Sequence, residues 1–95
     1  MLLNFMASAF AAHPYARRMS IVPSVKAKEI IAVLLKAGFK IVRQSGSHIR
    51  FQHKQDATRQ TGVPYHNVDV PRWLVREIMR QAKISVKEFL KLLRT

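Results

Sequence analysis

Between Ser24 and Ala37 the apolar residues recur at spacings of three and four, which is the period of an amphipathic helix. Lysines and a glutamate fill most of the intervening positions. Ser24 is suited to cap the first amides, and Gly38 to take the left-handed conformation that commonly ends a helix. The pattern therefore predicts a helix that ends near Ala37, with a core-facing set of Ala27, Ile30, Ile31, Leu34 and Leu35.

Three stretches with β-strand character follow the helix. Residues 39–44 and 48–53 each alternate with a period of two, and Ser45-Gly46-Ser47 between them predicts a hairpin turn. A third short strand is expected near residues 61–66. Pro64 lies within it and cannot donate a ladder hydrogen bond, so this strand belongs at an edge of the sheet.

Alternation also assigns the two faces of the second strand. Ile49 and Phe51 lie on one face, whereas His48, Arg50 and Gln52 lie on the other. If the apolar face packs on the helix, His48 faces solvent beside Arg50.

Two helices complete the predicted fold. Pro71 marks the start of the first, because its missing amide costs nothing there, and Ser85 with Glu88 has capping-box spacing for the second. The stripe expected to be buried in the first helix is Trp73, Leu74, Ile78, Met79 and Ala82. In the second helix it is Val86, Phe89, Leu90 and Leu93. The order αβββαα predicts an α+β fold, a three-stranded antiparallel meander with helices covering one face.

The first 23 residues differ from the rest because they carry an apolar run from Leu2 to Ala12. No lysine or arginine precedes this run, which argues against a secretory signal, and it is too short to span a bilayer. We expect residues 1–23 to be a disordered or non-native leader before an internal start at Met19. Residues 24–95 then form the single folded domain.

Charge narrows the range of partners. The 95 residues include 17 Lys and Arg against 5 Asp and Glu, a formal net charge of +12. Such a surface attracts phosphate polymers and makes their association sensitive to salt. Cysteine is absent, which rules out disulfides and thiolate metal sites and suits a reducing cytoplasm.

Gly46-Ser47-His48 is the strongest candidate for chemistry. An imidazole is suited to proton transfer near neutral pH and could take the proton from a ribose 2′-hydroxyl. Gly46 permits a close backbone approach, and turn amides near Ser47 could receive a phosphate oxygen. Ser47 lacks an acidic partner for a triad, so it is interpreted as a turn residue. The alternative is an ordinary strand histidine beside a glycine turn.

Arg72, Arg76 and Arg80 occupy one face of the predicted helix at spacings of four. Like charges at that spacing mildly destabilise a helix, which favours contact with phosphate or an acidic partner. A solvated face stiffened by Glu77 and nearby acids explains the row equally well.

The other histidines have weaker claims. If Val63 and Tyr65 point inward, His66 lies on the same open sheet face as His48 and could be a second imidazole, although a one-residue slip would reverse this. His13, His53 and His66 lack compact ligand spacing, so we expect no metal.

Aromatic residues could stack on bases, as in single-strand binders. Their core periodicity favours burial instead, for Phe39, Phe51, Tyr65, Trp73 and Phe89.

Several motifs together resemble one family. The order is a helix, Gly38-Phe39, a basic strand, Gly46-Ser47-His48, Phe51, Val63-Pro64, and a helix reading Leu74 to Ile78, followed by Gln81-Ala82 and Ile84-Ser85. Over about residues 25–93 this order is similar to the HicA toxins of bacterial toxin–antitoxin pairs. Lys83 departs from the pattern, because many relatives have glycine there.

The resemblance implies a fold similar to the double-stranded-RNA-binding domain and endoribonuclease activity on mRNA. It also implies that His48 is the catalytic residue, that Gly46 and Ser47 shape its turn, and that a HicB-type antitoxin covers the site. Neither a small-molecule cofactor nor a membrane partner is implied.

The residues and the resemblance support metal-independent RNA cleavage as the leading hypothesis. His48 would act as general base, directly or through water, while Arg50 offsets charge on the phosphorane. The acid that protonates the leaving group stays open between His66, Ser47 and water. One alternative is a non-catalytic RNA-binding module of the same fold. A second is a small interaction protein whose arginine row meets an acidic partner.

Overall fold

Strands and helices follow one another in the expected order. The structure, a computed structural model, describes residues 22–65 and 69–95. Its elements are β2 (Val25–Lys26), α3 (Ala27–Lys36), β3 (Phe39–Ser45), β4 (His48–His53), β5 (Gln60–Pro64), β6 (Asp69–Val70), α4 (Arg72–Ala82) and α5 (Val86–Arg94). The α+β fold class and the helix–meander–helix–helix order are therefore confirmed.

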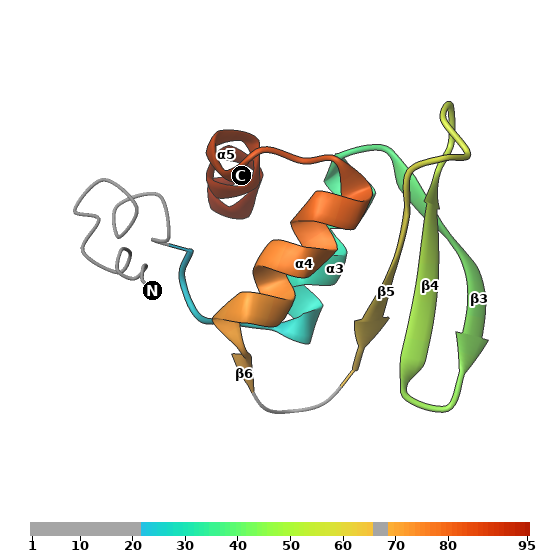
Figure 1. The fold of residues 1–95 in the computed structure, drawn as a ribbon, viewed down its shortest axis with the longest axis horizontal. Helices are drawn as coiled ribbons and strands as arrows, with labels where there is room; N and C mark the ends of the chain where they lie inside the picture. Colours follow the sequence, from blue (N-terminus) through green and yellow to red (C-terminus); the bar gives the residue numbers. More distant parts are fainter. Residues whose placement is uncertain (1–21, 66–68) are drawn as a thin grey trace, which may run out of the picture.

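The main sheet is antiparallel with strand order β3-β4-β5, so β5 is an edge strand as Pro64 predicted. Helices α3 and α4 pack against one face of it, and α5 lies on the far side of these helices from the β3–β4 hairpin (Figure 1). A second pair of strands, β2 and β6, was not predicted. Each has two residues, too few for a period to show in the sequence.

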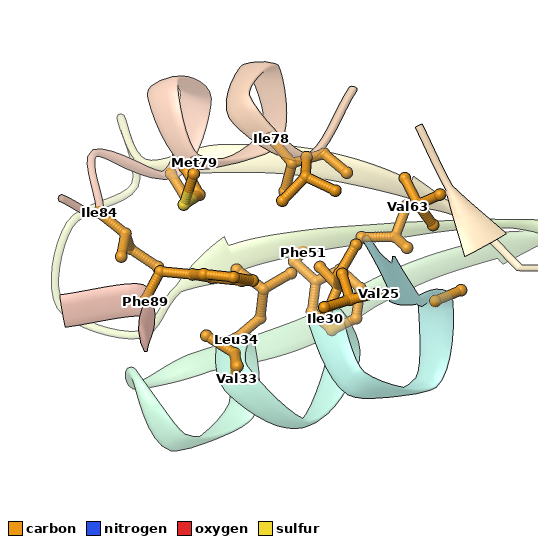
Figure 2. Packing of buried hydrophobic residues seen from close by; sticks show 14 of the residues in the cluster. Val25, Ile30, Val33, Leu34, Phe51, Val63, Ile78, Met79, Ile84 and Phe89 are labelled. Carbon is orange, nitrogen blue, oxygen red and sulfur yellow. The ribbon is translucent and has the colours of Figure 1, made fainter. Parts of the chain in front are cut away.

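Phe51 is at the centre of the core and is fully buried. Figure 2 shows it gathered with Ile30, Leu34 and Ile78 between the helices and the sheet. The buried polar side chain in the described core is Thr61, and its hydroxyl donates to Oε1 of Gln81 at 2.7 Å. Burying that hydroxyl without an acceptor would be costly, so this bond also fixes α4 against β5.

The predicted start of the first helix was wrong in detail. Ser24 does not cap α3, because the chain forms β2 before the helix begins at Ala27. The amide of Lys26 instead donates to Oε1 of Glu29 at 2.8 Å, while the hydroxyl of Ser24 donates to Asp69. The far end is as predicted, with Gly38 at a φ of 98°.

Lys83 takes the left-handed conformation that glycine would adopt more easily, with φ 59° and ψ 43° at the end of α4. Its amide donates to the carbonyl of Arg80, and the next amide, of Ile84, donates to that of Met79. The α4–α5 corner thus keeps its geometry without a glycine.

Trp73 and Tyr65 were predicted to be buried, and both are exposed, at 64% and 48%. Trp73 shares a helix face with Glu77 and Arg80, four and seven residues on, whereas the buried stripe of α4 is Val75, Ile78, Met79 and Ala82. Tyr65 follows the last residue of β5, beyond the paired part of the strand. The expected burial of Phe39, Phe51 and Phe89 is confirmed.

The expected leader, residues 1–23, lies outside the described residues except for Val22 and Pro23. Val22 is 1% exposed and belongs to the core cluster. In the described part of the chain, no helix is long and apolar enough to cross a membrane.

Truncating Phe51 tests the core. Phe51→Ala should lower the free energy of unfolding by about 3–5 kcal/mol, because it removes a large buried side chain and leaves a cavity. Urea denaturation followed by circular dichroism measures this. Trp73→Ala is the control and should change stability by less than about 0.5 kcal/mol. Equal effects of the two substitutions would contradict the packing described above.

Asp69 on β6 forms an ion pair with Nζ of Lys26 on β2 at 3.1 Å, so it links the two short strands to each other. The hydrogen bond from Lys26, its charge and the hydroxyl of Ser24 lower the pKa of Asp69. The folded-state pKa lies below the unfolded one, so the carboxylate stabilises the fold above about pH 4 and loses this effect as the pH falls through the lower value.

Asp69→Asn should therefore be less stable than the native chain at neutral pH. The difference should shrink steadily below about pH 4. Urea midpoints of both proteins across this range measure it, and a gap that does not depend on pH would show that the ion pair is not responsible.

Candidate functional site

The β3–β4 hairpin closes through a two-residue turn at Gly46-Ser47, between the paired residues Ser45 and His48. Gly46 has a φ of 59°, and Ser47 is not among the residues with positive φ. A positive φ at the first central residue alone fits a type II′ turn, in which glycine favours that position. The turn therefore fixes where β4 begins, with His48 as its first residue.

The faces of β4 are as the alternation predicted. Ile49 and Phe51 are buried, whereas His48 and Arg50 are exposed. Because α3 and α4 cover the Phe51 face, His48 and Arg50 lie on the uncovered face of the sheet, here called the outer face. Among the described residues, the His48 side chain has no hydrogen-bond or ion-pair partner.

A register shift in β3 brings Arg43 to the same face. Ile41 pairs with Phe51 and Arg43 pairs with Arg50, so Val42 is an extra residue, a β-bulge. Strict alternation would have put Arg43 on the face of Phe39, toward the helices. Directly opposite residues in an antiparallel pair share a face, so the bulge places Arg43 beside Arg50 and Ser45 beside His48.

Arg50 extends across the neighbouring edge strand. Its Nη2 donates to Oε1 of Gln60 at 3.3 Å, and Arg50 pairs with Gly62 on β5. A Cβ at Gly62 would lie 3.6 Å from Nη1 and 3.7 Å from Cδ of Arg50. A Cβ alone would therefore fit there, whereas a larger side chain at Gly62 would meet the Arg50 side chain.

These side chains surround a hollow on the outer face of about 380 Å³, lined by Val42, Arg43, Ser45, His48 and Arg50. An open hollow with two guanidinium groups and one imidazole suits an extended anionic ligand better than a small apolar one.

The charge on the outer face is not balanced locally. All five carboxylates of the chain lie elsewhere, and none is on β3, β4 or β5. Four of them have identified partners: Asp69 pairs with Lys26, Glu77 pairs with Arg80, Asp56 accepts from Thr58, and Glu29 accepts from the amide of Lys26. The sheet, by contrast, carries Lys40, Arg43 and Arg50 with no acid between them.

Ser47, one of the predicted site residues, does not line the hollow. Ser47 is in the turn, where its carbonyl accepts from the amide of Tyr65 at 2.6 Å, and the serine that lines the hollow is Ser45. His66 lies outside the described residues. The sequence analysis did not identify Arg43 and Ser45 as site residues. The one sign of the bulge in the sequence is the adjacent apolar pair Ile41-Val42, which breaks the alternation of β3.

The arginine row is separate from the hollow. Arg72, Arg76 and Arg80 are all exposed on α4, in the helical layer, and none lines the hollow. Arg80 donates twice to Glu77, at 2.9 and 2.6 Å, and these bonds lower the pKa of Glu77. Arg80 therefore lies on a solvated helix face and has Glu77 as its counter-ion. A role of the arginine row in RNA binding stays a prediction.

Within residues 22–65 and 69–95, no group of three or more His, Cys, Asp or Glu side chains could hold a metal ion. His53, one of the histidines considered as a ligand, packs edge-on against Phe39 with ring centroids 5.1 Å apart, and its Nδ1 accepts from the amide of Gln55. His13 and His66 lie outside these residues.

Comparison with known families agrees with this geometry. Comparison with individual curated proteins finds no match. The family described as the HicA toxin of bacterial toxin–antitoxin systems matches residues 27–84, which include α3, the whole three-stranded sheet and α4. That span is more than half of the chain and contains the hairpin with His48. The chain therefore belongs to the HicA toxin family.

Proposed function

We propose that this toxin is an endoribonuclease that cleaves mRNA without a metal ion, with His48 as its catalytic residue. The observation that carries the proposal is an exposed imidazole with no partner among the described residues, beside two arginines on a sheet face without acids. Membership of a toxin family adds that the chain acts on something essential to the cell.

The chemistry needs one base at the start. His48 takes the proton of a ribose 2′-hydroxyl, and the resulting oxygen attacks the adjacent phosphorus. The P–O bond to the 5′-oxygen of the next nucleotide breaks, and that oxygen takes up a proton from Ser47, His66 or water. Products are a 2′,3′-cyclic phosphate and a 5′-hydroxyl. Arg50 stabilises the extra negative charge that builds up on the phosphorane oxygens.

An RNA-binding module without catalysis is the second candidate. It is favoured by one observation: no residue that lines the hollow other than His48 is a usual proton donor or acceptor near neutral pH. The same cations would then hold RNA by its phosphates alone. The two functions differ in one result, because only the first yields defined fragments.

The family brings a cognate antitoxin as a partner. We propose that it is of the HicB type and covers the outer face, since any protein seated over the hollow would keep a polymer away from His48. The proposed site of action is the cytoplasm, where mRNA is translated.

Replacing His48 tests the catalytic proposal. His48→Ala should lower the rate of RNA cleavage by about a hundredfold or more, because it removes the only imidazole among the described residues that line the hollow. Purified protein and a labelled mRNA in buffer with a metal chelator give the rate. Gln52→Ala, on the same strand and face but outside the hollow, should cleave at the native rate.

Stability should be unaffected, since the imidazole is exposed and makes no hydrogen bond within the described residues. Full activity of His48→Ala with chelator present would refute the assignment. A salt-sensitive mobility shift by the native protein without fragments would favour the binding module.

A further inference from the structure

We propose that Arg43 and Arg50 form a clamp for one phosphodiester of a single RNA strand, the one on which His48 acts, and that the β-bulge at Val42 puts Arg43 into it. This inference rests on the proposed function for the identity of the polymer. The clamp itself follows from the register of β3 and from the charges around it.

The bulge is the first step. Without the extra residue at Val42, the period of two would turn Arg43 toward α3 and bring Gln44 out instead. Bulges commonly re-aim side chains next to functional sites. Here the re-aimed residue is a cation, and it comes to lie directly opposite Arg50 on the neighbouring strand.

Like charges directly opposite each other on a sheet are destabilising. Arg43 has no hydrogen-bond or ion-pair partner among the described residues, and Arg50 donates there only to the neutral amide oxygen of Gln60. Neither guanidinium is therefore compensated by charge within this part of the chain. An anion between them would remove the repulsion, so binding one would stabilise the protein.

A phosphodiester suits this place, and unlike a single carboxylate it carries a ribose on each side. Its two non-bridging oxygens can each accept from one guanidinium, and arginine forks match that geometry. His48 and Ser45 line the same hollow, so a phosphate held there places the adjoining ribose near the imidazole. The hollow is open to solvent, so a continuous strand can reach it.

Binding is measured in a His48→Ala background, so that RNA stays intact, with a short fluorescent single-stranded RNA at several salt concentrations. Arg43→Gln and Arg50→Gln should each weaken binding about tenfold or more, the value for loss of a charged hydrogen bond. Each should also lower the salt slope by about 0.7, the value for one phosphate contact on a single strand. Arg94→Gln, an exposed arginine at the end of α5, removes the same charge and should match the parent within about twofold.

Gly62 offers a test that removes no charge. Gly62→Ala puts a Cβ at an ordinary contact distance from Arg50 and should bind RNA normally. Gly62→Val adds methyl groups where the Arg50 side chain lies and should weaken binding as Arg50→Gln does. Circular dichroism confirms that each variant is folded.

In the native His48 background, Arg43→Gln should also lower kcat at saturating RNA by at least about tenfold. If Arg43→Gln binds and cleaves RNA as Arg94→Gln does, the clamp is wrong. If Arg43→Gln binds RNA as the parent does but no longer binds the antitoxin, the two arginines hold a carboxylate of that protein. This result also overturns the proposal.

The binding measurement does not depend on cleavage. If the native chain cuts no RNA but the Arg43, Arg50 and Gly62 variants behave as predicted, the proposed function fails and the clamp stands. If the native chain cuts RNA and these variants behave like the control, the clamp fails and the proposed function stands.

Discussion

Burial of the Phe51 face of the sheet under α3 and α4 is the constraint on which the rest of this structure depends. A strand alternates strictly, so once Ile49 and Phe51 are committed to the core, His48 and Arg50 are committed to water. A slip by one residue would exchange the two sets, burying a histidine and an arginine and exposing a phenylalanine. The packing of the core therefore decides on which face of the sheet His48 and Arg50 lie.

The turn and the bulge refine that arrangement from the two strands of the hairpin. Gly46 permits the tight turn that makes His48 the first residue of β4, and Val42 shifts the register of β3 so that Arg43 and Ser45 face the same way. The result gathers one imidazole and two guanidinium groups around one hollow. Because the five acids of the chain lie on other elements, the field at this face is positive without local compensation.

Much of this could be predicted from the sequence, because strong periodicity leaves little choice. The amphipathic pattern predicted α3 and its C-terminal end. Alternation placed His48 and Arg50 on the uncovered face of the sheet. The misses have physical causes. Trp73 was assigned to the core as part of an apolar stripe, although its helix position sets it beside Glu77 and Arg80. Arg43 was missed because a bulge is a property of strand pairing, and one strand read alone shows only the doubled apolar pair at Ile41 and Val42.

The ends of the RNA fragments test the central claim, that His48 on the outer face activates a ribose hydroxyl, most directly. Mass spectrometry of the products of the native toxin, made in buffer with a metal chelator, identifies these ends. The account predicts 2′,3′-cyclic phosphates and 5′-hydroxyls, because the nucleophile belongs to the substrate itself. Fragments with 3′-hydroxyls and 5′-phosphates would show that water, not the 2′-oxygen, attacks phosphorus, and would contradict it.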